Sequence, residues 1–434
     1  MDVEIQGPRS VNGEVIVNPD KSISHRAVFL SSLCRGKSTI YNINTGLDVL
    51  SSIKCMKELG VDFDFKDDAL IVSGRGLRLK EPSSILSSEN SGTTARLLIS
   101  ILSGQNFFSS VTGDDSLKRR PMRRIVEPMR SMGAKIWGRD DGNLLPVVIR
   151  GGVLTGGEFN LKVSSAQVKT ALLFSNFFSK DKVKVREPTK SRDHTERMLP
   201  YFGVEVIYDK NFLWIEGEPK PSEIFVPYDF SSAAFFIVAA IICKNSRISV
   251  KNVCVNPTRT GLLDALIKMG GKINIGNERI ISGEPIADIY AESSHITGSK
   301  FSGEIITRMI DEIPLLCIAS AFASGETEIR DAGELRVKES DRISSVSTGL
   351  KKFGVEVEEF PDGIKVVGKG GTGTGIPSTP ISEPIEIDSF SDHRIAMSFL
   401  VMGLASNSKV RIKNFEFVST SFPAFLEKIK TLIN

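Results

Sequence analysis

The sequence repeats one pattern of apolar and polar residues six times, at intervals of about 70 residues, and this repetition limits the folds open to the chain. Each repeat contains a nearly continuous apolar stretch, which predicts a buried helix because no face is left for water. A segment rich in β-branched residues follows each stretch and predicts a strand. The apolar stretches are AVFLSSLC, ARLLISIL, KTALLFSNFF, AAFFIVAAII, PLLCIASAFA and RIAMSFLVMGLA.

A second set of segments alternates with the first. Each is an amphipathic stretch that ends at a glycine and leads into a strand-like alternation of residues. Glycine in this place predicts a helix C-cap, where a positive φ is cheap without a Cβ. The glycines are Gly60, Gly133, Gly203, Gly270 and Gly354. Together the two sets predict an α/β fold of six units, each with a buried helix, a strand, an amphipathic helix and a further strand or hairpin.

The ends of the chain indicate how the six units are divided. The last unit stops at the amphipathic stretch FPAFLEKIKTLIN without a final strand, whereas the chain begins with a spare strand pair, VEIQG and GEVIVN. We therefore expect two similar domains of three units each, with the N-terminal strands completing the second. The first domain would span residues 20–228, and the second 1–19 plus 229–434, with a two-strand hinge near 18–20 and 227–230. A coincidental alternation of helices and strands is the alternative, and six matching pairs argue against it.

Composition excludes several classes of protein. Lys and Arg number 55 against 52 Asp and Glu, a net charge of +3, which disfavours a nucleic-acid binder. The longest apolar run, Ala233 to Cys243, is shorter than the ~20 residues that span a bilayer, and the N-terminus has no targeting pattern. Five dispersed cysteines without a CxxC motif indicate a reduced, cytoplasmic protein. Because there are four histidines and no HExxH motif, we expect no metal.

Polar and charged residues gather just before the apolar stretches. N-capping is the simplest interpretation of any one of them. Capping does not explain Lys21, Arg26, Gln167 or Arg394, however. Helix N-termini attract anions through free N–H groups and the helix dipole, so six such starts facing one cleft predict an anion-binding site. Basic residues at the starts of the amphipathic helices extend the pattern: Arg119, Arg120, Arg192, Arg259, Arg336, Lys338 and Arg342.

Carboxylates accompany these cations, and the combination is typical of acid–base chemistry on anionic substrates. They are Asp311, Glu312, Glu339, Asp341 and Asp392. The sequence has no GxSxG motif, no Cys–His arrangement and no GxxxxGK[ST]. We interpret the glycine-rich run 368–375, GKGGTGTG, as a plain loop. Without a metal or cofactor, such a site can carry out addition–elimination or simple group transfer.

At these residues the chain resembles the 5-enolpyruvylshikimate-3-phosphate (EPSP) synthase family. The resemblance covers nearly the whole chain, and RVKESDR and SDHRIAM are highly specific in combination. It rests on DKSISHRA (20–27), NSGTTARL (90–97), RRPM (119–122), SSAQVKTALL (164–173), IDEIPLL (310–316), RVKESDRI (336–343), DSFSDHRIAM (388–397) and TSFP (420–423).

The resemblance implies a two-domain inverse α/β barrel of βαβαββ repeats, three per domain, in agreement with the six units above. It implies transfer of the enolpyruvyl (carboxyvinyl) group of phosphoenolpyruvate to the 5-hydroxyl of shikimate 3-phosphate, with release of phosphate, on the route to chorismate and the aromatic amino acids. No cofactor is implied. The partners would be these two small molecules, with no nucleic acid and no membrane, and we expect a monomer.

The resemblance also implies residue roles. Shikimate 3-phosphate would be bound by Lys21, Ser22, Arg26, Ser164, Ser165, Gln167, Arg192, Asp311 and Lys338. Phosphoenolpyruvate would be bound by Lys21, Gly92, Arg120, Gln167, Arg342 and Arg394. In catalysis Asp311 would accept the proton of the attacking hydroxyl. Glu339, helped by Lys21, would protonate the methylene carbon, and a tetrahedral ketal would then lose phosphate.

Some positions depart from the better-known family pattern. Ala166 replaces a serine, Leu97 a proline, and Thr420 a lysine that often contacts ligand. The segments SAQVK, RDHTE, NPTR and TSFP favour the class II subgroup, although Pro19 stands where that subgroup has glycine.

Two rival functions stay open. The sister enzyme, UDP-N-acetylglucosamine enolpyruvyl transferase, has Lys-Asn in place of Lys21-Ser22 and usually a reactive cysteine in the loop that corresponds to 113–118, where this chain has none. A non-catalytic anion-binding repeat protein would bind without turnover, and would not need Asp311 or Glu339.

Overall fold

The computed structural model describes residues 1–371, 376 and 383–433 of the chain. These residues form two compact units. The central unit comprises Pro19–Val226 and Ile281–Glu284, and the terminal unit comprises Met1–Asn18, Pro227–Ile280 and Pro285–Asn434. The boundaries expected at 20 and 228 lie within two residues of these. The exception is Ile281–Glu284, a hairpin turn that we assigned to the second domain and that groups with the central unit.

The described strands of the central unit form three four-stranded sheets with one common order. In each sheet the first strand is parallel to the second, and a hairpin completes the sheet in antiparallel pairing. The first sheet holds β14 (Glu223–Phe225), β3 (Arg35–Tyr41), β5 (Ala69–Arg75) and β4 (Asp62–Lys66). The second holds β6 (Leu86–Ser87), β7 (Phe108–Thr112), β9 (Leu144–Arg150) and β8 (Lys135–Arg139). The third holds β10 (Gly157–Asn160), β11 (Val183–Arg186), β13 (Phe212–Glu216) and β12 (Glu205–Asp209).

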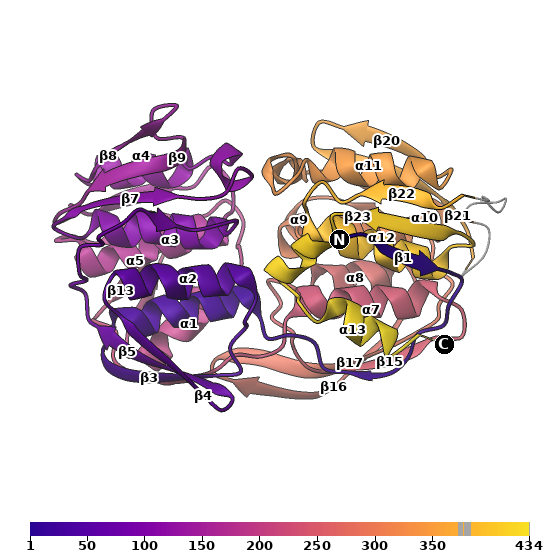
Figure 1. Ribbon diagram of the computed structural model, residues 1–434, viewed down its shortest axis with the longest axis horizontal. Helices are drawn as coiled ribbons and strands as arrows, with labels where there is room; N and C mark the ends of the chain where they lie inside the picture. Colours follow the sequence, from indigo (N-terminus) through magenta and orange to yellow (C-terminus); the bar gives the residue numbers. More distant parts are fainter. Residues whose placement is uncertain (372–375, 377–382, 434) are drawn as a thin grey trace. The chain divides into compact units, whose positions relative to one another are not determined.

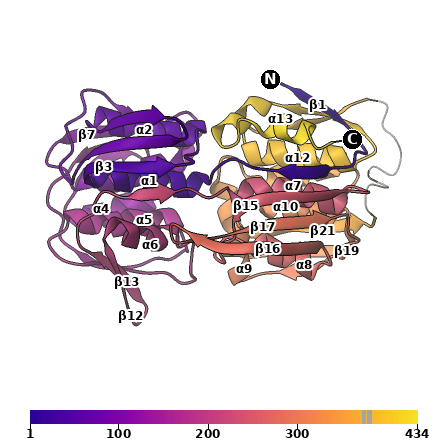
Figure 2. The same ribbon diagram turned by 90° about the horizontal axis from the view of Figure 1, so that it is seen from below.

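The described strands of the terminal unit repeat this order in two sheets and vary it in a third. One sheet holds β2 (Asn12–Val15), β15 (Arg247–Cys254), β17 (Glu284–Glu292) and β16 (Lys272–Ile281), and Figure 2 shows the last three side by side. Another holds β18 (Lys300–Phe301), β19 (Ser324–Ile329), β21 (Gly363–Lys369) and β20 (Glu356–Phe360). The third holds β22 (Ile385–Asp388), β23 (Lys409–Lys413) and β1 (Val3–Gln6).

The two N-terminal strands go to different sheets. β1 pairs antiparallel with β23, with Val3 opposite Ile412, and so takes the place of the hairpin that the last repeat lacks. β2 instead runs parallel to β15 and begins the sheet of another repeat. The spare strand pair expected to fill one gap therefore serves two sheets of the terminal unit.

Three buried helices form the core of each unit, and the sheets lie outside them (Figure 1). In the terminal unit α7 (Phe230–Ile242), α10 (Ile313–Ala321) and α12 (His393–Ala405) pack against one another, and every residue of the three is buried. The central unit has α1 (Lys21–Leu33), α3 (Gly92–Ser103) and α5 (Ala166–Ser175) in the equivalent places. The six apolar stretches are thus the six core helices, as the sequence predicts.

The remaining described helices are the six amphipathic members of the repeats and α9, which directly precedes core helix α10. They are α2 (Leu47–Glu58), α4 (Arg123–Ser131), α6 (His194–Met198), α8 (Gly261–Lys268), α9 (Glu304–Met309), α11 (Arg342–Lys352) and α13 (Phe425–Lys430). Short 3-10 helices are η1 (Leu117–Arg119), η2 (Asn176–Phe178), η3 (Leu199–Phe202), η4 (Gly333–Val337) and η5 (Phe415–Thr420). None of the described helices combines the length and apolar character needed to cross a membrane.

The glycines that follow the amphipathic helices adopt the expected left-handed conformation. Their φ angles are 87° at Gly60, 104° at Gly133, 71° at Gly203, 99° at Gly270 and 70° at Gly354. In the glycine-rich run 368–375, Gly368 and Lys369 end strand β21, and residues 372–375 lie outside the described residues.

Candidate active site

The starts of the core helices are capped by polar side chains, with one exception. Asp20, Ser91, Ser165, Asp229 and Asp392 each accept a hydrogen bond from a backbone N–H of the first turn of their helix. Glu312 precedes α10 but makes no such bond with its side chain. N-capping therefore explains the polar residue at five of the six helix starts, and it uses some of the free N–H groups there. It does not explain the charged residues beside the caps.

Arg26 joins three helices of the central unit from a buried position. Its Nε donates to Thr195 Oγ1 at 2.8 Å, and its Nη2 donates to Thr170 Oγ1 at 2.9 Å. A third bond, from Nη1 to the carbonyl of Ser22 at 2.8 Å, closes the first turn of α1. Burial lowers the pKa of Arg26 to about 10, while the carboxylates of Glu196 and Asp20 act in the opposite direction. Arg26 is 3% exposed, so its position predicts an anchoring role beside any contact with ligand.

Lys21 and Ser22 lie in the first turn of α1, next to the Asp20 cap. Nζ of Lys21 is 3.0 Å from Oδ2 of Asp48, and the two side chains are 19% and 12% exposed. Ser22 is half-buried. Asp48 therefore holds the ammonium group near the helix start, where a positive charge and free N–H groups both favour an anion.

Two guanidinium groups converge over Gly92, the first residue of α3. A Cβ at this position would lie 2.8 Å from Nη1 of Arg96 and 3.5 Å from Nη1 of Arg120. Arg120 is fixed by Asn90, which accepts from its Nη2 at 2.8 Å. Gln167, on α5, joins the group over Gly92, because its Oε1 accepts from Arg96 Nη1 at 2.6 Å.

Arg96 is a candidate residue that the sequence-based set omits. It lies one turn after Gly92 on α3, which places its side chain over the helix start. That spacing was the available signal, but spacing alone does not distinguish it from a solvated surface arginine.

Ser164, Ser165 and Arg192 lie at the start of α5 and in the loop before α6. The hydroxyl of Ser165 accepts from the N–H of Val168 at 3.4 Å. Ser164 holds the loop, because its hydroxyl accepts from the N–H of Thr189 at 3.1 Å and donates to the carbonyl of the same residue. Arg192 is half-buried.

Lys169 anchors the same loop from inside the protein. Its Nζ lies 2.8 Å from Glu187 and 2.7 Å from Glu196, and it is 1% exposed. Burial acts to lower the pKa of Lys169, but these two carboxylates hold it above its ordinary value. Lys169 therefore pairs with one carboxylate before Arg192 in the sequence and one after it, and holds both ends of the segment 187–196.

Arg342 is the centre of the predicted residues in the terminal unit. Its Nε lies 2.8 Å from Oδ2 of Asp392, its Nη1 3.2 Å from Oδ1 of Asp311 and its Nη2 2.6 Å from Oε2 of Glu339. Although burial acts to lower its pKa, the carboxylates of Asp392, Glu339 and Asp311 hold the pKa of Arg342 above its ordinary value. A permanently charged, buried guanidinium thus fixes both predicted acid–base carboxylates.

Lys338 and Arg394 complete this group. Nζ of Lys338 is 3.4 Å from Oδ1 of Asp311. Nη1 of Arg394 donates to the carbonyl of Asp311 at 3.1 Å and lies 3.3 Å from Oε1 of Glu312, while its Nη2 is 3.8 Å from Oδ2 of Asp311. Three cations therefore surround Asp311, which is 15% exposed, and Glu339 is 17% exposed.

Each unit thus holds one group of predicted residues. The central unit brings together Lys21, Ser22, Arg26, Gly92, Arg120, Ser164, Ser165, Gln167 and Arg192. The terminal unit brings together Asp311, Lys338, Glu339, Arg342 and Arg394. Thr420 is 9% exposed and donates its hydroxyl to the carbonyl of Phe417 at 2.7 Å.

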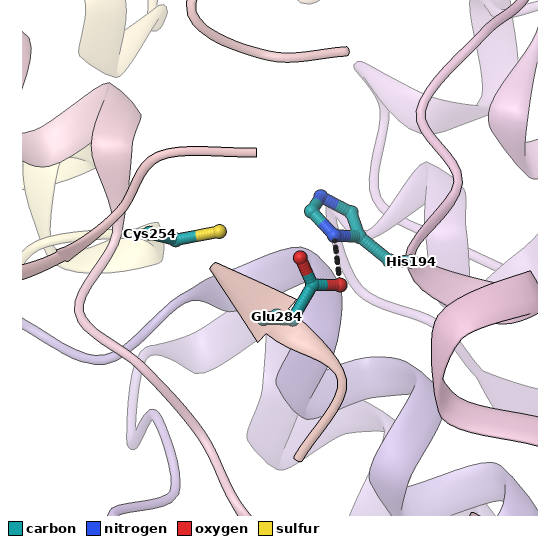
Figure 3. A group of neighbouring side chains, drawn as sticks. All are labelled: His194, Cys254 and Glu284. Atoms are coloured by element: carbon teal, nitrogen blue, oxygen red, sulfur yellow. Dashed lines mark hydrogen bonds and ion pairs between the residues drawn. The ribbon is translucent and has the colours of Figure 1, made fainter. Parts of the chain in front are cut away.

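A buried histidine–carboxylate pair lies outside these groups (Figure 3). A hydrogen bond of 2.7 Å joins Nδ1 of His194 and Oε1 of Glu284, both in the central unit. Cys254, also drawn in Figure 3, belongs to the terminal unit, so we assign no metal to these three side chains. The expectation of no metal stays a prediction.

The whole chain is similar to proteins of known family. Residues 5–429 match the family described as EPSP synthase (3-phosphoshikimate 1-carboxyvinyltransferase). A 3-phosphoshikimate 1-carboxyvinyltransferase of Pelobacter propionicus is 44% identical over 99% of both chains, and one of Petrotoga mobilis is 42% identical over 100% of both. The solved EPSP synthase of Acinetobacter baumannii superposes with a TM-score of 0.85 at 39% identity, over 100% of this chain and 99% of that one.

Proposed function

The chain belongs to the EPSP synthase family, and from that premise we propose how its residues transfer the enolpyruvyl group of phosphoenolpyruvate to the 5-hydroxyl of shikimate 3-phosphate. The products of this reaction are 5-enolpyruvylshikimate 3-phosphate and phosphate, on the route to chorismate. The inverse α/β barrel implied by the resemblance is the fold of the chain.

One observation carries the assignment of chemistry: Asp311 and Glu339 contact the two Nη groups of the same buried arginine. Both carboxylates are held in place and partly exposed, so they can reach a substrate. Neighbouring cations favour the ionised form of a carboxylate, and Asp311 has Lys338, Arg342 and Arg394 around it. With the roles that the family resemblance implies, we assign Asp311 as the base and Glu339 as the acid.

The proposed reaction has two steps. Asp311 accepts the proton of the 5-hydroxyl as that oxygen bonds to C2 of phosphoenolpyruvate. Glu339, with Lys21, delivers a proton to the methylene carbon, and a tetrahedral ketal forms. A proton then returns from the new methyl group to Glu339 as the bond between C2 and the phosphate oxygen breaks, which restores the double bond. The proton that Asp311 accepted passes to the departing phosphate. Alignment of two bound substrates can lower such a barrier by about 7–11 kcal/mol.

The anion-binding assignments follow the same premise. For phosphoenolpyruvate we propose Lys21, Gly92, Arg120, Gln167, Arg342 and Arg394. The convergence of Arg96 and Arg120 over Gly92 supports this, because arginine donates in a bidentate fork to phosphate or carboxylate. For shikimate 3-phosphate we propose Lys21, Ser22, Arg26, Ser164, Ser165, Gln167, Arg192, Asp311 and Lys338.

We also propose a cytoplasmic monomer of class II type, with domains 20–228 and 1–19 plus 229–434, apart from the turn Ile281–Glu284 that groups with the first. The cytoplasmic assignment is supported by the five cysteines, all of them free and buried, since proteins of oxidising compartments usually pair theirs.

A phosphate-release assay with both substrates tests the reaction. We expect phosphate only when phosphoenolpyruvate and shikimate 3-phosphate are present together, and no phosphate when either is omitted. Release with UDP-N-acetylglucosamine in place of shikimate 3-phosphate would favour the sister reaction. Binding of both ligands without release would favour a non-catalytic anion-binding protein.

A further inference from the structure

Arg259 is a fully buried arginine that the proposed reaction does not use. It lies in the turn before α8 and is 1% exposed. Its Nη2 donates to the hydroxyl of Ser231 at 2.5 Å and lies 3.3 Å from Oδ1 of Asp229. Burial of a charged guanidinium is costly unless it is paired and hydrogen-bonded, so the contacts of Arg259 need an explanation beyond surface charge.

A chain of hydrogen bonds leads from Arg259 to Arg394. The hydroxyl of Ser231 donates to Oε1 of Glu312, and the same oxygen lies 3.3 Å from Nη1 of Arg394. Since a guanidinium can only donate and a serine hydroxyl has one hydrogen, the direction of the chain is fixed: Arg259 donates to Ser231, and Ser231 donates to Glu312. All four side chains lie in the terminal unit and are at least nine-tenths buried.

The side chain of Glu312 points toward this series of hydrogen bonds and not toward the first turn of its own helix, α10. The other five residues that precede core helices cap a backbone N–H, and Glu312 does not. Its second oxygen, Oε2, is buried and has no hydrogen-bond partner among the described residues. The position of its carboxylate is therefore set through Oε1, between Ser231 and Arg394.

We propose that Arg259, acting through Ser231 and Glu312, is a positioning residue for Arg394 and so for the phosphoenolpyruvate site. This inference rests on the proposed function. Glu312 holds Nη1 of Arg394, and a carboxylate there also competes with an incoming anion for the guanidinium. Arg259 polarises the Ser231 hydroxyl and so strengthens the hydrogen bond from Ser231 to Glu312. This weakens the attraction of Glu312 for Arg394.

Ser231→Ala tests the connection with little change in volume. Ser232→Ala is the matched control, because Ser232 lies in the same turn of α7 and is 6% exposed. Its hydroxyl is not one of the groups that connect Arg259 to Arg394. Coupling energies along such networks correspond to about 3- to 30-fold in binding. We expect Ser231→Ala to raise the KM for phosphoenolpyruvate by that factor at saturating shikimate 3-phosphate. The KM for shikimate 3-phosphate should stay within twofold.

A double variant separates positioning from a merely structural role. Arg259→Met should also raise the KM for phosphoenolpyruvate, because Ser231 keeps its bond to Glu312 but loses the positively charged donor beside it. Adding Glu312→Gln removes the competing charge and keeps an oxygen that can accept from Ser231. We therefore expect Arg259→Met/Glu312→Gln to have a lower donor KM than Arg259→Met, which loss of packing alone would not produce.

The outcomes distinguish this inference from the proposed function. If the wild-type protein releases no phosphate from the two substrates, the proposed function is wrong. If the wild-type protein is active and Ser231→Ala has the donor KM of Ser232→Ala, the positioning role is wrong. Should Arg259→Met fail to fold, the comparison of Ser231→Ala with Ser232→Ala decides the matter by itself.

Discussion

Arg342 and Asp392 form an ion pair with no access to water: Nε lies 2.8 Å from Oδ2, and the two side chains are 1% and 0% exposed. The two Nη groups of the same guanidinium contact Glu339 and Asp311, which are partly exposed. One buried arginine thus pairs with one fully buried carboxylate and with two carboxylates that solvent can reach. The buried pair and the partly exposed pairs predict different consequences for mutation.

Asp392→Asn should destabilise the protein. Asparagine can still accept the N–H of Arg394 and cap α12, so the change isolates the charge. Loss of one partner of a buried ion pair costs about 3–5 kcal/mol, and we expect a clear fall in the thermal unfolding midpoint. Asp388→Asn, at an exposed carboxylate on the preceding strand, is the control and should unfold like the wild type. Equal midpoints for the two variants would contradict the anchoring role.

Asp311→Asn and Glu339→Gln should affect turnover more than stability, because both side chains are partly exposed and Arg342 keeps Asp392. General acid–base groups contribute ~10²–10⁴-fold, so we expect kcat to fall by that order in each variant. Steady-state phosphate release measures this, with the unfolding midpoint as the control for folding. Turnover near the wild-type rate in either variant would remove that residue from the mechanism.

Arg394→Ala should weaken phosphoenolpyruvate binding. A hydrogen bond to a charged group contributes about 1.5–3 kcal/mol, which is about one to two decades in Kd. Titration of the donor with shikimate 3-phosphate already saturating measures the effect. Arg411→Ala, in an exposed network with Glu4 and Glu386, is the control. An equal loss of binary shikimate 3-phosphate affinity in folded Arg394→Ala would place Arg394 on the other ligand.

Gly92→Ala should raise the KM for phosphoenolpyruvate. The added Cβ would lie 2.8 Å from Nη1 of Arg96, and because this atom ends a flexible side chain, the guanidinium can move without unfolding the protein. Its displacement also strains the bond to Gln167. Gly152→Ala is the control, since a Cβ there meets nothing within 4 Å. An unchanged donor KM would show that the space over Gly92 is not part of the site.

His25 should make the protein sensitive to acid. Burial first, then the charges of Lys21 and Arg26, hold its pKa well below the ordinary 6.5. Between that folded value and about 6.5 the unfolded chain binds more protons, so the free energy of unfolding falls as pH drops below 6.5.

The substitution His25→Gln checks this prediction. Glutamine can still bond to Ser52, the present partner of Nδ1, but cannot titrate. We expect the difference between urea midpoints at pH 7.5 and 5.5 to shrink in this variant. His295→Gln, at an exposed histidine, should leave the difference unchanged.

The architecture could be predicted from the sequence because its signals are local. Nearly continuous apolar stretches mark the core helices, and the glycines that end the amphipathic helices need a positive φ that other residues adopt at a cost. The partners of the N-terminal strands were predicted only in part, since nothing in VEIQG or GEVIVN says that one pairs with β23 and the other with β15. Strand pairing across such a distance in the chain is decided by the whole fold.

The interactions within the candidate site could be predicted less well. Repeat position and resemblance pointed to Arg342 and Arg394, but not to which carboxylates they contact. Arg259 occurs in the same pattern of basic helix starts, yet it is buried and faces Ser231. Side-chain direction after a turn depends on tertiary packing, which short motifs do not encode.

The pairing of β1 with β23 has a consequence for biosynthesis. During synthesis β1 must wait for β23, and translation at about 5–20 residues per second separates the two strands by about 20–80 seconds. The central unit, made almost entirely of one continuous segment, can fold in that interval. Until β23 emerges, the β1 backbone lacks its partner, and an unpaired strand is a template for pairing with other chains. Each nascent chain therefore carries β1 without its partner strand until residues 409–413 have emerged.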